Sequence, residues 1–176
     1  MDNIYLCHSE VCRRISMRSF GCTQDDLGYM SNALVTIGLP THNGSRTLRR
    51  ALNTLLAQTY KNFELIISDN ASTDETGYIC EEYAVRDNRI RYIRQKENIG
   101  PLRNFKFVAD RARGEFFMWA ADDDSWHPEF IEKLLAKLQT NPAAGVAMSS
   151  HRLIYTDGEL MEEVRYEGDL DLSGRS

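Results

Sequence analysis

The chain has 176 residues, 42% of them hydrophobic and 27% charged, which excludes a disordered polymer and makes two full domains an unfavourable interpretation. No apolar run approaches the roughly 20 residues that cross a bilayer, so the sequence predicts no transmembrane segment. Lys and Arg total 21 against 26 Asp and Glu, and the resulting net charge of −5 argues against a nucleic-acid binder.

Residues 1–32 differ from the rest of the chain, and we expect them to form a poorly ordered N-terminal extension. They hold Cys7, Cys12 and Cys22, whose spacing matches no zinc motif. They also lack the apolar stretch of a secretory signal. The four cysteines of the chain are too few and too unevenly placed for a disulfide scaffold, so a reducing cytoplasm is the expected location. Met30 stands just before the first strand-like segment, and translation could begin at Met1 or at Met30.

Strand-like and helix-like segments alternate over residues 33–166, which predicts one α/β domain. A β-rich apolar run over residues 34–39, stopped by Pro40, predicts the first strand, and residues 63–68 predict the second. The spacing of Ser72 and Glu75 predicts a capping box for the helix that follows. The buried faces of the first two helices are predicted to be Leu48, Ala51, Leu52, Leu55 and Leu56, and then Ile79, Cys80, Tyr83 and Ala84.

The second half of the pattern begins with a strand over residues 90–93 and a turn that places Pro101 at a helix start. Residues 116–121 predict a strand buried on both faces, and a hairpin is expected over residues 146–164, before a frayed tail at 167–176. The inner helix faces are predicted to be Leu102, Phe105, Val108, Ala109 and Ala112, and then Ile131, Leu134, Leu135 and Leu138. The alternation predicts a mainly parallel sheet with helices on both faces.

Polar residues follow three of the predicted strands, where ligands bind in parallel α/β sheets. These residues are Pro40, Thr41, His42, Asn43 and Gly44 after the first strand, Asp69, Asn70 and Ser72 after the second, and Asp122, Asp123 and Asp124 after the fourth. Three adjacent carboxylates repel one another, and a divalent cation such as Mg²⁺ or Mn²⁺ would remove that cost. The alternative is that these residues only cap helices, shape turns or face water.

Four ordered segments together resemble the family 2 glycosyltransferases: VTIGLPTHN (35–43), LLAQTYKNFELIISDNASTDET (55–76), ENIG (97–100) and GEFFMWAADDDSWHPEF (114–130). The resemblance implies the GT-A fold, a Rossmann-like nucleotide-diphospho-sugar transferase fold, here C-terminally truncated. It implies transfer of a sugar from a nucleotide-diphosphate sugar to an acceptor hydroxyl, with inversion, in cell-surface polysaccharide or glycan synthesis. This chain would hold the donor- and metal-binding half, with the catalytic base beyond Ser176.

The resemblance also implies which residues bind the nucleotide. Pro40, Thr41, His42 and Asn43 match a turn that packs on the base, with His42 in place of the family's aromatic residue. Asp69 and Asn70 match the loop after the second strand. Asn70 stands where an aspartate often pairs with uracil, so UDP, dTDP and other nucleotides all stay open. Arg103 or Asn104 would position the ribose or the diphosphate.

The acidic triplet matches the family's Asp-x-Asp motif. Aligned through Trp126, the common form Asp-x-Asp-Asp has Ala121 in place of its first acid. This alignment implies that Asp123 is the first metal ligand, that Asp124 is the next, and that Asp122 lies nearer the ribose.

The implied cofactor is Mg²⁺ or Mn²⁺, the implied donor a UDP- or dTDP-sugar, and the implied acceptor a glycan or lipid-linked sugar. The implied location is the cytoplasm, with peripheral association at the inner face of the membrane left open. Three alternatives also stay open: a catalytically inactive nucleotide-binding fragment, a non-catalytic interaction module, and a sugar-phosphate nucleotidyltransferase. The last usually carries a Gly-rich loop with a basic residue, of which residues 42–46 are a poor version.

Overall fold

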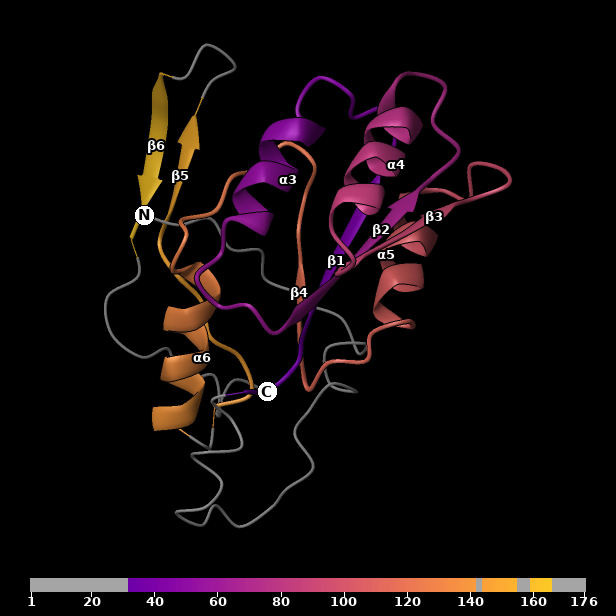
Figure 1. Ribbon diagram of the computed structural model, residues 1–176. Helices are drawn as coiled ribbons and strands as arrows, with labels where there is room; N and C mark the ends of the chain where they lie inside the picture. The colour runs from indigo at the N-terminus through magenta and orange to yellow at the C-terminus, as the bar shows by residue number, and fades with distance from the viewer. Residues whose placement is uncertain (1–31, 142–143, 155–158, 166–176) are drawn as a thin grey trace, which may run out of the picture.

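The computed structural model describes residues 32–141, 144–154 and 159–165 (Figure 1). The predicted N-terminal extension up to residue 31, the hairpin tip at Asp157–Gly158 and the tail over 167–176 lie outside the described residues. The described strands of the main sheet are β1 (Val35–Thr41), β2 (Phe63–Asp69), β3 (Ile90–Arg94) and β4 (Phe116–Trp119). They pair in the order β3-β2-β1-β4 and every pair is parallel, which confirms the predicted parallel sheet.

The helices between and after these strands are α3 (Leu48–Leu56), α4 (Thr76–Arg86), α5 (Pro101–Ala109) and α6 (Phe130–Thr140). A separate antiparallel hairpin follows, formed by β5 (His151–Ile154) and β6 (Leu160–Val164). The predicted hairpin is therefore confirmed, although its first strand begins later than expected. Among the described residues, no helix is both long and apolar enough to cross a membrane.

The first strand runs two residues further than predicted, because Pro40 does not end it. Pro40 pairs with Ser68 and Thr41 pairs with Asp69. The Gly38 carbonyl accepts a hydrogen bond from the backbone N–H of Ala120 at 2.8 Å, so the backbone polar groups of Gly38 point toward the β4 side. Those of Pro40, two residues further along the strand, point to the same side. Pairing with β4 stops at Gly38, so no strand lies opposite the backbone nitrogen of Pro40. The absence of an N–H on proline therefore removes no hydrogen bond from the sheet.

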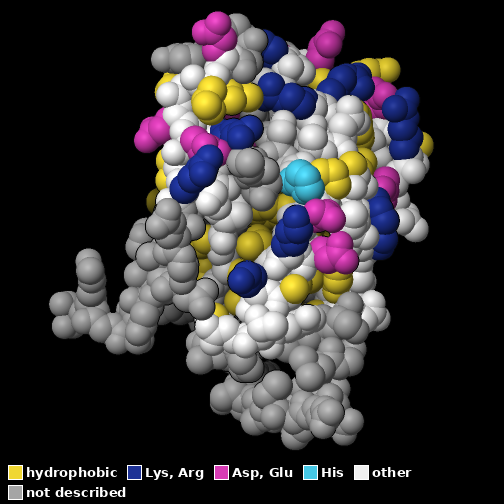
Figure 2. Space-filling model, turned by 90° about the vertical axis from the view of Figure 1, so that its left-hand side faces the viewer, with side chains coloured by type: hydrophobic (Ala, Val, Ile, Leu, Met, Phe, Trp, Pro, Cys, Tyr) yellow, Lys and Arg dark blue, Asp and Glu magenta, His cyan; other side chains and the backbone are white. Residues whose placement is uncertain are grey.

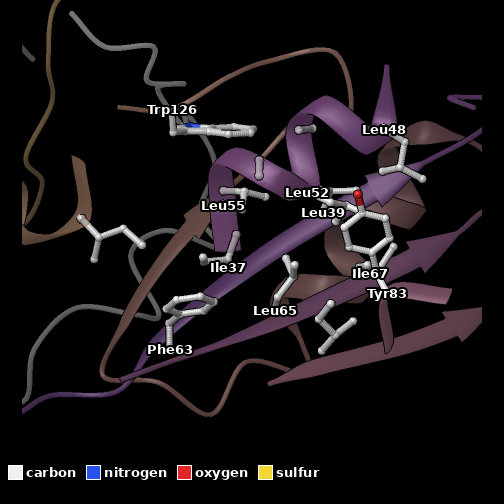
Figure 3. Close-up of a cluster of buried hydrophobic side chains, with 14 of the residues drawn as sticks. Ile37, Leu39, Leu48, Leu52, Leu55, Phe63, Leu65, Ile67, Tyr83 and Trp126 are labelled. Carbon is white, nitrogen blue, oxygen red and sulfur yellow. The ribbon is translucent and has the colours of Figure 1, made fainter. Parts of the chain in front are cut away.

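The main core lies between one face of the sheet and helices α3 and α4. Ile37 of β1 lies beside Leu55 of α3, and Leu39 lies beside Leu52 of α3 and Tyr83 of α4 (Figure 3). Both predicted helix faces are confirmed, since four of the five α3 residues are fully buried and Ile79, Cys80 and Tyr83 of α4 are buried as well. Burial of each large aliphatic side chain contributes about 1.5–3 kcal/mol, which makes this layer the main source of stability.

Helix α5 covers the opposite face, so the prediction of helices on both faces is confirmed. A Cβ built on Gly38 would lie 2.8 Å from Cγ2 of Val108 in α5, which shows how closely the helix approaches β1. The predicted inner face of α5 is wrong in part, because Leu102 is 83% exposed and Phe105 is 41% exposed. The helix instead buries Asn104 and Val108, one turn apart, and Asn104 is held by hydrogen bonds at the end of β2.

Strand β4 was predicted to be buried on both faces, and this is wrong for the described residues. All four of its residues are half-buried, and the strand forms an edge of the four-stranded sheet. An edge strand has a neighbour on one side only, which leaves part of each side chain accessible. Helix α6 packs on the main core as predicted, through Phe130, Ile131 and Leu135.

The predicted capping box at the start of α4 is also wrong. Glu75 makes no side-chain cap hydrogen bond, and the Ser72 hydroxyl accepts instead from the backbone N–H of Asn43 at 2.9 Å. The Asp74 carboxylate accepts from the backbone N–H of Thr76 at 3.0 Å and from that of Ser45 at 3.1 Å. Asp74 therefore takes over the capping role and fastens the loop after β1 to the start of α4.

Replacing Asp74 with alanine is expected to lower the free energy of unfolding by about 1 kcal/mol at neutral pH, the usual cost of losing a helix cap. Burial alone would raise the pKa of Asp74, but the hydrogen bonds from Thr76 and Ser45 outweigh it and hold the pKa well below its usual range. A lowered folded-state pKa stabilises the protein above the unfolded value of about 3.9, and this contribution is lost as the pH falls further. Urea unfolding of parent and variant from pH 7 to pH 3 should show the difference shrinking below about pH 4, and a constant difference would contradict this account.

The surface carries charges of both signs. Figure 2 shows one face of the molecule, and on it Lys and Arg side chains are interspersed with Asp and Glu side chains rather than gathered in one large basic patch. This pattern agrees with the net charge of −5.

Candidate functional site

The loops after β1 and β2 are fastened to each other at the carboxyl edge of the sheet. The backbone N–H of Asn43 donates to the Ser72 hydroxyl at 2.9 Å, and the backbone N–H of Thr73 donates to the Asn43 side-chain oxygen, also at 2.9 Å. Each loop therefore supplies a donor and an acceptor to the other. This edge is where parallel α/β sheets bind ligands.

The acidic loop after β4 joins the same edge through Asp122. The Thr41 hydroxyl at the end of β1 donates a hydrogen bond to a carboxylate oxygen of Asp122. A Cβ built on Gly44 would overlap this carboxylate and lie 2.8 Å from the Thr41 hydroxyl oxygen, so any larger residue at position 44 would push the Asp122 side chain away from Thr41. Asp122 and the turn that follows β1 thus form one packed unit.

Burial raises the pKa of Asp122, and the neighbouring charge of Asp123 raises it further, while the hydrogen bond from Thr41 works in the opposite direction. The negative charge of Asp122 is therefore poorly compensated by the protein itself. A cation bound at this edge would favour the ionised form.

Asp123 stands at the rim of the site on a loop whose backbone is anchored. Its side chain is exposed, whereas its carbonyl oxygen accepts a hydrogen bond from the Arg50 guanidinium at 2.6 Å. The loop is also held where the backbone N–H of Trp126 donates to the Thr54 hydroxyl at 3.3 Å, and the Trp126 side chain is buried in the core. Asp124 lies between these anchors and is half-buried.

Within the described ranges, no three His, Cys, Asp or Glu side chains converge as a ready-made metal site. Asp122 turns inward to Thr41, whereas Asp123 is exposed. This arrangement fits a cation held by only one or two carboxylates, as Mg²⁺ usually is, with water and phosphate oxygens completing its shell.

Asp69 is fully buried, and both of its carboxylate oxygens are engaged within the protein. One oxygen accepts from the backbone N–H of Ser72 at 2.8 Å, and the other accepts from the Tyr92 hydroxyl at 3.1 Å. Burial and the charge of Asp69 raise the pKa of Tyr92, so this hydroxyl stays a donor. Arg94 spans the same loop by donating to the Ser72 carbonyl at 2.6 Å. The structure thus places Asp69 beneath the candidate site, where it shapes the loop after β2.

Asn70 is also buried, and it connects the loop after β2 to the turn before α5. Its side-chain oxygen accepts from the backbone N–H of Ile99 at 2.8 Å, and its NH₂ group donates to the Asn98 side-chain oxygen at 2.9 Å. His42 is exposed beside this turn, with its Nε2 atom 3.3 Å from the side-chain nitrogen of Asn98. The sequence predicted that Asn70 and His42 lie at the same edge of the sheet. The structure shows that Asn98 contacts both of them.

The structure gives different positions to Arg103 and Asn104, the two α5 residues predicted to position the ribose or the diphosphate. Asn104 is buried, its side-chain oxygen accepts from the Ser68 hydroxyl at 2.6 Å, and its NH₂ group donates to the Ser68 carbonyl at 2.9 Å. Arg103 is exposed on the first turn of the same helix. Asn104 therefore joins α5 to β2, and Arg103 is the one of the pair that can meet a ligand.

The sequence model of glycosyl transferase family 2 matches residues 36–166. The chain belongs to this family. Its relatives include GlyG, a glycosyltransferase of Streptococcus pneumoniae serotype 4, which is 30% identical over 125 residues that make up 71% of this chain and 42% of GlyG. An uncharacterized glycosyltransferase of Rickettsia conorii is 34% identical over 137 residues, covering 75% of this chain and 20% of that protein. The chain thus spans less than half the length of these family 2 relatives.

Solved structures of glycosyltransferases share the fold. S. aureus TarS 1-349 in complex with UDP-GlcNAc superposes with a TM-score of 0.58 at 22% identity, over 70% of this chain and 41% of TarS 1-349. The mannosyltransferase PcManGT from Pyrobaculum calidifontis, in complex with GDP-Man and Mn²⁺, gives a TM-score of 0.55 at 20% identity, over 73% of this chain and 37% of PcManGT. The domain therefore has the GT-A fold, as predicted. The match to the family 2 model, rather than the fold, favours a glycosyltransferase over the nucleotidyltransferase alternative.

Several residues that shape this family 2 site had no assigned role in the sequence analysis. Gly44 was marked only as a turn residue, and the presence of glycine in that turn was the one available signal. Arg50 lies on the exposed face of α3, and nothing in its sequence context indicates that it reaches the Asp123 carbonyl. Asn98 was recognised as part of a turn, and its contact with His42 depends on the tertiary arrangement.

Replacing Asn104 with alanine is expected to lower the free energy of unfolding by about 1–3 kcal/mol, because it removes the acceptor of the buried Ser68 hydroxyl and a donor to the Ser68 carbonyl. The matched variant Arg103→Ala removes an exposed side chain from the same turn and should change stability by less than about 0.5 kcal/mol. Chemical unfolding of the two variants measures both values. Equal stabilities of the two variants would contradict the inward role of Asn104.

Proposed function

We propose that this chain binds a nucleotide-diphosphate sugar at the carboxyl edge of its sheet, together with Mg²⁺ or Mn²⁺. It would serve the inverting transfer of the sugar to a hydroxyl of a glycan or lipid-linked acceptor in cell-surface polysaccharide synthesis. The observation that carries the proposal is the contact of Thr41 and Gly44 with Asp122, which joins the turn after β1 to the acidic loop after β4. The family membership and the two ligand-bound fold neighbours support it.

In the proposed site the base lies against the turn from Pro40 to Asn43, and Asp122 accepts from the ribose. Asp69 and Asn70 hold the loop after β2 in place beneath the nucleotide, because their polar groups are engaged within the protein. Arg103 is exposed on the first turn of α5, and its positive charge would meet the diphosphate.

Asp123 would hold the cation and Asp124 would be the second carboxylate at the site. The exposed carboxylate of Asp123 is free to turn toward a ligand while Arg50 keeps its backbone in place. When bound, the cation neutralises the negative charge that develops on the departing nucleotide. The proposed donors are UDP- and dTDP-sugars, and the proposed location is the cytoplasm at the inner face of the membrane.

Isothermal titration calorimetry tests the donor proposal directly. UDP, dTDP and GDP are titrated into the chain with Mn²⁺, with Mg²⁺, and with EDTA in place of either metal. We expect UDP or dTDP to bind with metal and to bind much more weakly in EDTA. Equal heats with and without metal would overturn the metal part of the proposal, and no heat with any nucleotide would overturn the whole of it.

A further inference from the structure

The direction of the Asn98 side chain can be deduced from the backbone around it. The backbone N–H of Gly100 points at the Asn98 side-chain oxygen at 2.9 Å, and a backbone N–H can only donate. The NH₂ group of Asn70 donates to the same oxygen, and Asn70 is oriented in turn by the backbone N–H of Ile99. The other end of the Asn98 amide is therefore its NH₂ group, which faces Nε2 of His42 at 3.3 Å.

The Asn43 side chain leads to the same conclusion from a different loop. The backbone N–H of Thr73 points at the Asn43 side-chain oxygen at 2.9 Å, so that end of the amide is the acceptor. The NH₂ group of Asn43 then faces Nε2 of His42 at 3.4 Å. Two independently oriented donors therefore converge on one ring nitrogen.

A ring nitrogen that receives two N–H donors must be the acceptor, so the neutral imidazole of His42 carries its proton on Nδ1. Nδ1 has no hydrogen-bond partner among the described residues, and the His42 side chain is exposed. The ring is thus held at one nitrogen by two loops, and it presents an N–H donor at the other.

Asn70 is poorly placed to do what an exposed aspartate at its position would do. It is only 3% exposed, its side-chain oxygen accepts from the backbone N–H of Ile99, and its NH₂ group donates to Asn98. A base that approaches the turn after β1 therefore meets the donor on His42 rather than an acceptor on Asn70. The two departures from the family pattern, at positions 42 and 70, belong to one hydrogen-bonded network.

We infer that His42 is a specificity-determining residue that donates its Nδ1–H to a carbonyl oxygen of the base, with its tautomer set by Asn98 and Asn43. This inference rests on the proposed function, and it narrows the ligand to nucleoside diphosphates whose base carries a carbonyl group, such as uracil and thymine. Adenine, which has no carbonyl group, is disfavoured.

The tautomer is measured on the free protein by two-dimensional ¹⁵N NMR of labelled histidine at a pH where His42 is neutral, with His42→Gln identifying the resonance. We expect the pattern of an Nδ1-protonated ring. An Nε2-protonated ring would overturn the inference whether or not nucleotides bind.

Two variants test the roles of the two ring nitrogens of His42 separately. Glutamine places its side-chain oxygen near the position of Nε2, and asparagine places its NH₂ group near the position of Nδ1. His42→Gln keeps an acceptor for Asn98 and Asn43 but removes the proposed donor, so UDP with Mn²⁺ should bind about 10-fold more weakly. His42→Asn keeps a donor and should stay within about 3-fold of the parent. The parent should also bind UDP at least about 10-fold more tightly than ADP.

His42→Gln binding as tightly as the parent would overturn the inference while leaving the proposed function intact, and so would equal affinities of the parent for UDP and ADP. Loss of affinity in His42→Asn equal to that in His42→Gln would also overturn it. If the parent binds no nucleotide with Mn²⁺, the proposed function fails, and the donor role of His42 fails with it. Thermal unfolding of both variants confirms that each is folded before binding is compared.

Discussion

Replacing Asp123 with alanine is expected to weaken Mn²⁺-dependent binding of UDP or dTDP by about 100-fold or more, because a bound cation contributes several kcal/mol of interaction with the phosphates. The change removes a carboxylate that is exposed at the rim of the site. It leaves the loop anchored, since Arg50 contacts the carbonyl oxygen of residue 123 and not its side chain. Calorimetry with and without EDTA measures the effect, and the residual binding of the variant should no longer depend on metal.

A matched control is Asp110→Ala, which removes another exposed carboxylate, at the far end of α5, where it pairs with Lys106. Exposed pairs of this kind contribute little to stability, so we expect this variant to keep both its fold and its metal-dependent binding. An Asp123→Ala variant that binds nucleotide as tightly as the parent, with the same dependence on Mn²⁺, would remove Asp123 from the metal site and leave Asp124 to be tested in the same way.

Replacing Leu52 with alanine is expected to lower the free energy of unfolding by about 2–5 kcal/mol, the range observed when a large buried aliphatic side chain is truncated. Leu52 has no exposed surface and lies on α3 next to Leu39 of β1 and Tyr83 of α4 (Figure 3). The neighbouring side chains belong to a sheet and two helices that cannot all close the cavity, so the cost should lie well above that of a surface change. Equilibrium unfolding in urea measures it.

Leu102→Ala is the matched control for this substitution, because the helical pattern predicted both leucines to be buried. Leu102 is 83% exposed on α5, and its truncation should change the stability by less than about 0.5 kcal/mol. A loss above 2 kcal/mol in Leu102→Ala would show that this surface is covered in solution. A loss below 1 kcal/mol in Leu52→Ala would contradict the packing of the main core.

Helix α5 shows why the apolar pattern alone misplaced a helix face. Leu102, Phe105 and Ala109 have helical spacing, and the pattern ranks a polar residue such as Asn104 as outward-facing. In the structure Asn104 turns inward because the Ser68 hydroxyl and carbonyl at the end of β2 satisfy its amide. Hydrogen-bond partners supplied by another strand are invisible to a pattern read along one helix.

In the candidate site, too, the sequence predicted the positions of the loops but not the directions of their side chains. Residue type and position after each strand predicted that the loops beginning at Pro40, Asp69 and Asp122 lie at one edge, and the parallel order of the strands confirms this. Which way each side chain turns could not be predicted: Asp69 is fully buried, while Asp123 is exposed. The capping box was wrong for a similar reason, since the Ser72 hydroxyl finds its donor on Asn43, in a different loop.

The amino-acid sequence by itself determined the α/β alternation, the buried faces of α3 and α4, and the family to which the chain belongs, because these depend on local periodicity and on ordered motifs. Only the tertiary structure decided that Asn98 contacts both Asn70 and His42, that Gly44 packs against Asp122, and that Arg50 anchors the acidic loop. Those contacts join residues far apart in the chain, and they exist only once the sheet has brought its carboxyl ends together.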